Sequence, residues 1–186
     1  MRSPHVLVAY ASRHDSTAEI ATAIAHEIDR VGCQTTLGEV RTIEAVGPYD
    51  AAVIGSALYL GRWDDAAIAF LRREQAALAA IPTWLFSSGP VGVGSATARP
   101  DRLPQPDDVA DLADAIGARS TTFGGRVDAS DEGLEAQIMA TAGLTGDWRD
   151  FGRIRAWGRA IGASILERAD EATEEATNGR APEGRP

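Results

Sequence analysis

The sequence predicts an α/β fold in which a five-stranded parallel sheet is covered by helices on both faces. Short apolar runs alternate five times with longer segments that have helical periodicity. This alternation is typical of βαβ units, in which each helix carries the chain back to the start of the next strand. At 186 residues the chain is long enough for one well-buried domain, which we expect to occupy residues 1–170.

The first half of the chain contains three of the expected strands. Residues 5–11 are a short apolar run rich in β-branched side chains, which indicates a buried strand. Residues 16–32 form a helix by their pattern, because three isoleucines recur at a spacing of four and a glycine ends the segment. The second strand is expected at residues 33–40, where the alternation is weak, and the third at residues 49–57.

The second half continues the alternation. It is expected to contain a helix at residues 64–81, the fourth strand at 83–89 and a Gly/Pro-rich loop at 90–106. Another helix is expected at residues 107–117 and the fifth strand at 119–127.

Three further segments follow the last expected strand. An extra helix is predicted at residues 131–143 and a final helix at residues 150–170. The remaining tail, residues 171–186, has no apolar periodicity, and we expect it to be disordered.

Composition narrows the range of partners and compartments. A net charge of −9 argues against nucleic acid, which binds basic surfaces. Cys33 is the only cysteine, which excludes an internal disulfide and suits a reducing cytoplasm. No apolar run is long enough to span a bilayer, although a peripheral membrane contact is compatible with the sequence. The composition does not specify an oligomeric state.

Unusual residues gather in three loops that leave the first, third and fourth strands. These loops, residues 12–17, 56–64 and 87–94, are rich in Gly, Ser or aromatic side chains. In an open parallel sheet, ligands bind beyond the carboxyl ends of the strands, where the strand order reverses. We therefore expect a ligand site at this edge.

The first loop has two interpretations. Its hydroxyls, on Ser12, Ser16 and Thr17, lie at the start of a helix whose first N–H groups are free to bind an anion. Alternatively, residues 16–19 form a capping box that satisfies the helix start without a ligand. Neither a dinucleotide-type glycine motif nor a Walker Gly-Lys pair is present.

The other two loops are also open to two interpretations. Tyr59 and Trp63 are able to stack on a flat ligand or to plug the loop against the sheet. We favour packing for Trp63, as the first packing residue of the following helix, and leave both roles open for Tyr59. The glycines at 89 and 92 allow close backbone approach to a ligand, but they also suit a flexible surface loop.

Taken in this order, the three loops resemble those of the flavodoxin family. The matching segments are "VLVAYASRHDSTAEIA" (6–21), "YDAAVIGSALYLGRWDDAAIAFL" (49–71) and "PTWLFSSGPVG" (82–92). Two more, "FGGRVD" (123–128) and "GDWRDFGRIRAWGRAIG" (146–162), are similar to the bacterial branch of flavodoxin-type, menaquinone-linked protoporphyrinogen oxidases.

This resemblance implies a flavodoxin-like three-layer sandwich with strand order 2-1-3-4-5 and FMN as cofactor. FMN would supply the redox chemistry, and the protein would bind the ring and set its redox potential. By similarity, the FMN phosphate would lie among Ser12, His14, Asp15, Ser16 and Thr17. One side of the flavin ring would be lined by Ala57, Leu58, Tyr59 and Gly61. The other side would be lined by Ser88, Gly89, Pro90 and Val91.

Asp15 is a departure from the family pattern, because family members usually have glycine there. Two like charges about 5 Å apart lower an affinity by roughly a hundredfold at an effective dielectric of about 20. Aspartate nevertheless tolerates a left-handed backbone better than most residues, so the turn itself can survive.

Three functions follow as hypotheses. The first is an FMN oxidoreductase, including a protoporphyrinogen oxidase-like activity, that passes electrons to a quinone or protein partner. The second is an electron carrier without a substrate of its own. The third, favoured by Asp15, is a non-enzymatic module with weakened FMN binding.

Overall fold

The predicted strand order is confirmed. The structure, a computed structural model, describes residues 2–59, 61–89, 105–131, 134–143 and 145–178. Its main sheet has the order β2-β1-β3-β5-β6, with parallel pairing along this path. This is the predicted order 2-1-3-4-5, because the short strand β4 pairs with β3 off this path and shifts the later strand numbers by one. The strands are β1 (His5–Ala11), β2 (Gln34–Glu39), β3 (Ala51–Tyr59), β5 (Thr83–Ser88) and β6 (Arg119–Phe123).

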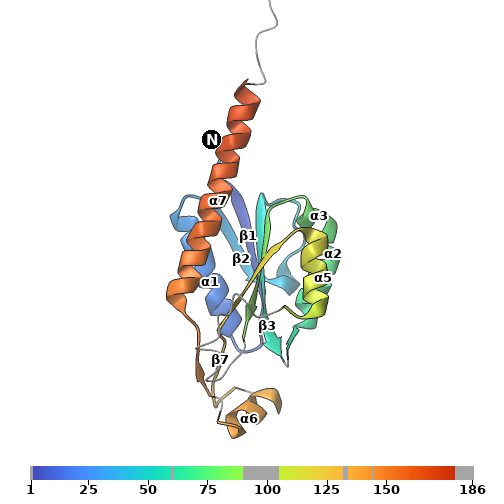
Figure 1. Ribbon diagram of the computed structural model, residues 1–186, viewed down its shortest axis with the longest axis vertical. Helices are drawn as coiled ribbons and strands as arrows, with labels where there is room; N and C mark the ends of the chain where they lie inside the picture. Colours follow the sequence, from blue (N-terminus) through green and yellow to red (C-terminus); the bar gives the residue numbers. More distant parts are fainter. Residues whose placement is uncertain (1, 60, 90–104, 132–133, 144, 179–186) are drawn as a thin grey trace, which may run out of the picture.

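Helices cover both faces of the sheet (Figure 1), which makes three layers. On one face lie α1 (Ser16–Arg30) and α7 (Phe151–Asn178), and on the other α2 (Asp65–Arg73), α3 (Gln75–Ala79) and α5 (Asp107–Ile116). A 3-10 turn, η1 (Val40–Thr42), follows β2. Because the inner strands β1, β3 and β5 bury apolar side chains on both sides, a hydrophobic core forms on each face of the sheet.

The first difference from the sequence prediction lies after β3. Trp63 belongs to a short strand, β4 (Arg62–Trp63), which pairs antiparallel with the end of β3, rather than to a helix start. The helix predicted at residues 64–81 is divided at Glu74, whose φ of −98° and ψ of 8° leave the helical range. We attribute this break to a tertiary contact, because the Glu74 carboxylate accepts the Val46 N–H at 3.0 Å.

The second difference lies after β6. The strand predicted to continue to residue 127 leaves the sheet at Gly124, where a Cβ atom would lie 2.0 Å from the Trp148 carbonyl oxygen. The chain then forms a separate two-stranded ribbon of β7 (Arg126–Val127) and β8 (Gly146–Asp147). Helix α6 (Leu134–Thr141) lies within the span predicted as an extra helix, beyond the ribbon and away from the sheet (Figure 1).

The third difference is the end of the last helix. It was predicted to stop at residue 170, before a disordered tail, but α7 continues to Asn178. Residues 171–178 are rich in Glu and Ala, which have high helix propensity, and extending an existing helix requires no new nucleation. A helix can therefore continue without an apolar stripe.

No helix in the ranges given above combines the length and apolar character needed to cross a bilayer.

Glycines allow α7 to pack closely on α1. A Cβ atom at Gly158 would lie 3.0 Å from the Ile24 carbonyl oxygen, and one at Gly162 would lie 2.3 Å from Val31 Cγ2. Beside this contact, the buried Glu27 carboxylate accepts a hydrogen bond from Arg159 Nη1 at 2.9 Å. This bond holds the pKa of Glu27 below its ordinary value. The two helices are thus joined by close packing and by an ion pair.

We expect Gly55→Ala to destabilise the protein by about 1–3 kcal/mol, the usual cost of overpacking a core. The added Cβ would lie 2.0 Å from Cζ of Phe86, a fully buried ring packed against Phe123 and Trp157. Chemical denaturation measures the free energy of unfolding. Gly47→Ala is the matched control, because its Cβ would meet nothing within 4 Å. Equal stabilities for the two variants would contradict this account of the core.

Candidate functional site

The carboxyl ends of β1, β3 and β5 lie side by side at one edge of the sheet. Ala11 is in register with Ser56, and Ala57 with Ser88. The chain goes from β1 outward to β2 and then back across to β3, so the strand order reverses between β1 and β3. This is the position at which open α/β sheets bind ligands, and the predicted site loops leave from it.

The first loop makes a tight turn between β1 and α1. Ser12 directly follows β1, and Asp15 immediately precedes the helix in a left-handed conformation with φ 57° and ψ −13°. Asp15 is the only non-glycine residue with positive φ in the described part of the chain. The Ser16 N–H donates to the His14 carbonyl at 2.6 Å, which closes the turn. Aspartate therefore adopts the backbone conformation that glycine would usually supply here.

The alternative of a capping box at residues 16–19 is wrong. Ser16 is the first residue of the helix, not the residue that caps it, and Asp15 makes no side-chain capping bond. The Glu19 carboxylate, which would have completed the box, forms ion pairs with Arg126 and Arg149 instead. The helix start is consequently not satisfied by its own side chains.

Two buried hydroxyls point to a ligand at this loop. Ser16 is 7% exposed and Thr17 is fully buried, and the structure gives no hydrogen-bond partner to Ser16 Oγ or Thr17 Oγ1. A buried polar atom without a partner costs about 1–3 kcal/mol. Since both hydroxyls lie in the first turn of a helix, whose leading backbone N–H groups have no carbonyl partner within the helix, the arrangement fits an anion with several oxygens, such as a phosphate.

The second loop folds over the first. The Tyr59 hydroxyl accepts a hydrogen bond from the Arg13 N–H at 3.0 Å, and the Arg13 guanidinium lies 4.4 Å from the centre of the Tyr59 ring. The His14 ring contacts the same tyrosine edge-on at 6.4 Å between centroids. Tyr59 therefore lies beside the turn that precedes α1. Ala57 and Leu58 are half-buried, and Gly61, with φ 76°, forms the turn into β4.

Trp63 is confirmed as a packing residue. Its side chain is 3% exposed, and its indole N–H donates to Ser87 Oγ at 2.8 Å. Ser87 in turn donates to Gln105 Oε1, whose amide group donates to Thr122 Oγ1. The indole thus belongs to a hydrogen-bond chain that connects the second loop with β5, with the segment before α5 and with β6.

Asp64 joins the second loop to the first, a role that the sequence did not reveal. It is 4% exposed and caps α2 by accepting the Ala66 N–H at 3.0 Å. Its carboxylate also pairs with Arg13 Nε at 3.2 Å and Arg41 Nη2 at 3.3 Å. The partners lie more than twenty residues away along the chain, so no local pattern could have identified them.

The third loop begins close to the second. Ser88 is buried, and Gly89 has a φ of +130° and donates its N–H to the Phe123 carbonyl at 2.9 Å. A Cβ atom at Gly89 would lie 3.1 Å from Leu58 Cβ, so the two loops are in contact at this point. Pro90 and Val91, which the sequence also assigned to this side of the ring, lie outside the described residues.

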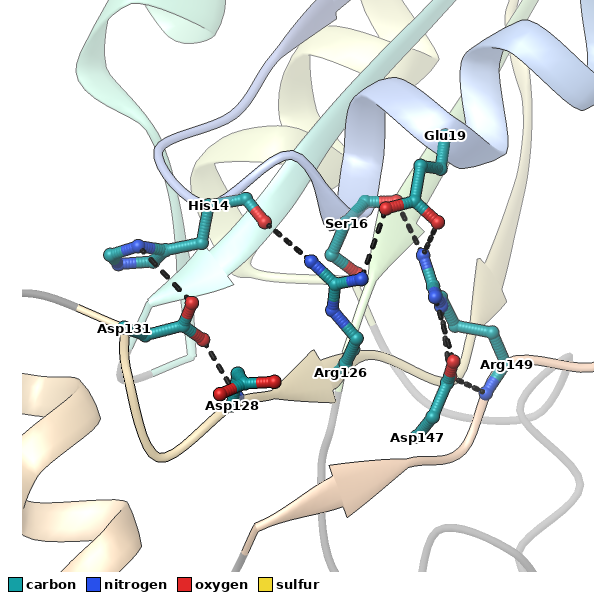
Figure 2. A network of polar contacts seen from close by, with 8 residues as sticks. All are labelled: His14, Ser16, Glu19, Arg126, Asp128, Asp131, Asp147 and Arg149. Atoms are coloured by element: carbon teal, nitrogen blue, oxygen red, sulfur yellow. Dashed lines mark hydrogen bonds and ion pairs between the residues drawn. The ribbon is translucent and has the colours of Figure 1, made fainter.

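An ion-pair cluster borders the first loop on the side of the ribbon (Figure 2). Arg149 is 3% exposed; its Nη1 donates to Glu19 at 2.9 Å, and its Nε and Nη2 donate to the two Asp147 oxygens. The Arg149 guanidinium holds the pKa of Asp147 below its ordinary value. On the other side of Glu19, Arg126 Nη1 donates to its second oxygen at 3.0 Å.

The cluster also contacts the backbone of the first loop. Arg126 Nη2 donates to the His14 carbonyl at 3.3 Å, and Arg149 Nη1 to the Ser16 carbonyl at 3.4 Å. The His14 ring lies 3.8 Å from an oxygen of Asp131, which follows β7. The ribbon therefore holds the first loop from outside the sheet, although more than one hundred residues separate the two along the chain.

The strand order, the loop after β1 and the two loops beside it together define a flavodoxin-like protein. A sequence profile of the flavodoxin domain family matches residues 7–140. The chain therefore belongs to the flavodoxin domain family. Membership in this family implies FMN as the cofactor, and the buried hydroxyls of the first loop fit its phosphate.

Solved structures show the same fold at low sequence identity. An archaeal flavodoxin is 13% identical to this chain, with a TM-score of 0.59, and the alignment covers 87% of this chain and 99% of the flavodoxin. A Streptococcus pneumoniae flavodoxin is 18% identical, with a TM-score of 0.55, covering 86% and 99% respectively. The rubredoxin oxygen:oxidoreductase of Desulfovibrio gigas is 12% identical, with a TM-score of 0.59; 90% of this chain aligns, but only 38% of that one. No curated protein matches the chain in sequence.

We expect Trp63→Ala to lower stability by about 3–5 kcal/mol, the usual cost of removing a large buried ring. FMN affinity of the folded protein should change less than threefold, because the indole faces Ser87. Thermal melting and flavin titration measure the two quantities. Trp63→Phe keeps most of the packing and should cost less. An unchanged melting temperature with tenfold weaker FMN binding would show that Trp63 contacts the ring instead.

Proposed function

We propose that this chain is an FMN-binding oxidoreductase that exchanges electrons with a quinone or a protein partner. The observation that carries the proposal is the pair of buried hydroxyls without partners, Ser16 Oγ and Thr17 Oγ1, at the loop after β1. FMN, when bound, supplies the redox chemistry. The residues of the chain bind its phosphate, position its ring and limit the access of water.

The proposed phosphate site consists of residues 12–17. Ser16 and Thr17 donate from their hydroxyls, and the start of α1 contributes backbone N–H groups and the positive end of the helix dipole. Ser12 and His14 line the turn beside them. Because Arg13 and Tyr59 already join the first and second loops, the phosphate and ring sites are coupled through this contact.

The proposed ring site lies between the second and third loops. Ala57, Leu58, Tyr59 and Gly61 would line one side, and Ser88, Gly89, Pro90 and Val91 the other. The contact between Leu58 and Gly89 and the hydrogen bond from Trp63 to Ser87 support this assignment, because they connect the loops before any ligand is present.

The proposed reaction is oxidation of a protoporphyrinogen-like substrate in the cytoplasm. Its support is the resemblance of residues 123–128 and 146–162 to that branch of the family. These segments include both strands of the ribbon and the start of α7. Turnover of protoporphyrinogen with a quinone acceptor tests this reaction, and electron transfer without such turnover would instead identify an electron carrier.

Asp15 favours a second candidate, a non-enzymatic module with weakened FMN binding. Its carboxylate adds a negative charge at the turn that would surround a dianionic phosphate. The absorbance spectrum of the purified protein, with and without added FMN, separates this candidate from the two redox functions.

FMN should bind the full chain in a one-to-one complex with a Kd below about 100 µM, which corresponds to about 5.5 kcal/mol. Fluorescence titration should show saturable quenching, and riboflavin, which lacks the phosphate, should bind at least tenfold more weakly. Absence of quenching at this concentration would defeat the cofactor assignment.

Thr17→Val is the matched variant for that titration. It replaces the buried Thr17 hydroxyl by a methyl group of similar size, so the free protein should be equally or more stable. FMN affinity should fall about tenfold, while riboflavin affinity should stay within twofold. An equal loss for both flavins would show that Thr17 does not contact the phosphate.

Asp15→Asn should tighten FMN binding, by up to about tenfold, because it removes a negative charge and preserves the shape of the side chain. The side chain is exposed, so water screens it, and the gain should be smaller than the roughly hundredfold effect calculated above for two like charges about 5 Å apart. Asp15→Gly should give a similar gain, since glycine adopts the φ of 57° without strain.

Riboflavin is the control for both substitutions at Asp15. Its affinity should barely change, because it lacks the phosphate that the carboxylate would repel. If Asp15→Asn leaves FMN affinity within twofold, the carboxylate has no effect on the site, and the candidate of a module with weakened binding loses its support.

A further inference from the structure

Arg126 has a donor that its contacts in the structure do not use. Its Nη1 pairs with Glu19 at 3.0 Å and its Nη2 with the His14 carbonyl at 3.3 Å (Figure 2). Its Nε, by contrast, is buried and has no hydrogen-bond partner in the described part of the chain. Leaving a buried charged donor without a partner is more costly than leaving a neutral one.

The unpaired Nε belongs to the same part of the molecule as the two unpaired hydroxyls. The Arg126 guanidinium contacts His14 and Glu19, the residues that flank Ser16 and Thr17 in the chain. These three side chains hold all of the buried side-chain polar atoms that lack a partner in the described ranges. A guanidinium N–H can only donate, and a hydroxyl can also donate, so one ligand with several acceptor oxygens would satisfy all three.

In Arg149, the other arginine of the cluster, every guanidinium nitrogen has a hydrogen-bond partner. Both Asp147 oxygens, one Glu19 oxygen and the Ser16 carbonyl accept its hydrogen bonds. The two guanidiniums and the two carboxylates balance in charge, so the cluster alone attracts no anion. What distinguishes Arg126 is therefore its free, permanently charged donor next to the loop.

We propose that Arg126 is a further phosphate-binding residue, whose Nε–H donates to the FMN phosphate bound at residues 12–17. This inference rests on the proposed function. It extends the cofactor site from the three sheet loops to the β7–β8 ribbon. Arg149 is then a positioning residue, because its bonds to Glu19 and Asp147 hold the ribbon against α1.

Arg126→Gln tests the proposal in the full chain. It removes the guanidinium donors and the charge, and FMN affinity should fall at least tenfold, while riboflavin affinity stays within twofold. Arg126→Lys keeps the charge but lacks the Nε donor, so its loss should be smaller and still selective for FMN. Fluorescence quenching titrations of both flavins at one ionic strength give these affinities.

Arg159→Gln is the matched control. It also breaks an ion pair with a glutamate of α1, at Glu27, which lies two turns beyond Glu19 on the helix. Both flavins should bind this variant as they bind the unmodified chain. A selective loss of FMN in the control would show that weakened helix anchoring, and not a phosphate contact, explains the result for Arg126.

The outcomes separate this inference from the proposed function. If the unmodified chain binds no FMN, the proposed function fails and the inference fails with it. If the unmodified chain binds FMN and Arg126→Gln binds it equally well, or loses both flavins equally, only the inference is overturned. Thermal melting checks folding; if Arg126→Gln is unfolded, a loss in Arg126→Lys that is below threefold or equal for both flavins overturns the inference.

Discussion

The placement of α1 is the constraint on which the candidate site depends. Its first turn carries the phosphate loop, so any shift of this helix would move the proposed ligands. Ile20, Ile24 and Ile28 are fully buried against the sheet, and close packing with α7 prevents lateral movement. Glu19 joins the start of the helix to the ribbon. Because β1 is a central strand, both ends of the loop are anchored in rigid elements.

Local patterns were sufficient to predict most of the elements that build this frame. The spacing of the three isoleucines predicted α1, and short apolar runs predicted the strands whose carboxyl ends form the site edge. The order of those strands came from the resemblance to flavodoxins. Trp63 was correctly assigned to packing, although on the wrong element, because a two-residue strand such as β4 has no periodicity to detect.

Features that depend on distant contacts could not be predicted. The pairs of Glu19 with Arg126 and Arg149 join residues more than one hundred positions apart, and Asp64 likewise joins separate loops. The capping box at residues 16–19 failed for the same reason, since the arginines of the ribbon compete for its glutamate. The local pattern was genuine, but a tertiary ion pair determined the outcome.

Unpaired buried polar atoms are exceptional within the described ranges, and their location is informative. Sequences usually satisfy local and global preferences together, and conflicts between the two tend to occur at functional sites. Here the conflict is confined to the start of α1 and the neighbouring Arg126. A suitable anion would give these atoms the hydrogen-bond partners that the chain itself does not supply.

Asp15 has to be considered together with this arrangement. Its left-handed backbone shows that the turn keeps its shape without glycine, so the departure from the family pattern is electrostatic and not conformational. The carboxylate is exposed, where water and salt screen it, whereas the Arg126 Nε is buried although 29% of the side chain is exposed. At equal distances from a phosphate, a donor atom that water does not reach would have a larger effect than an exposed carboxylate, which makes an aspartate at this turn compatible with anion binding.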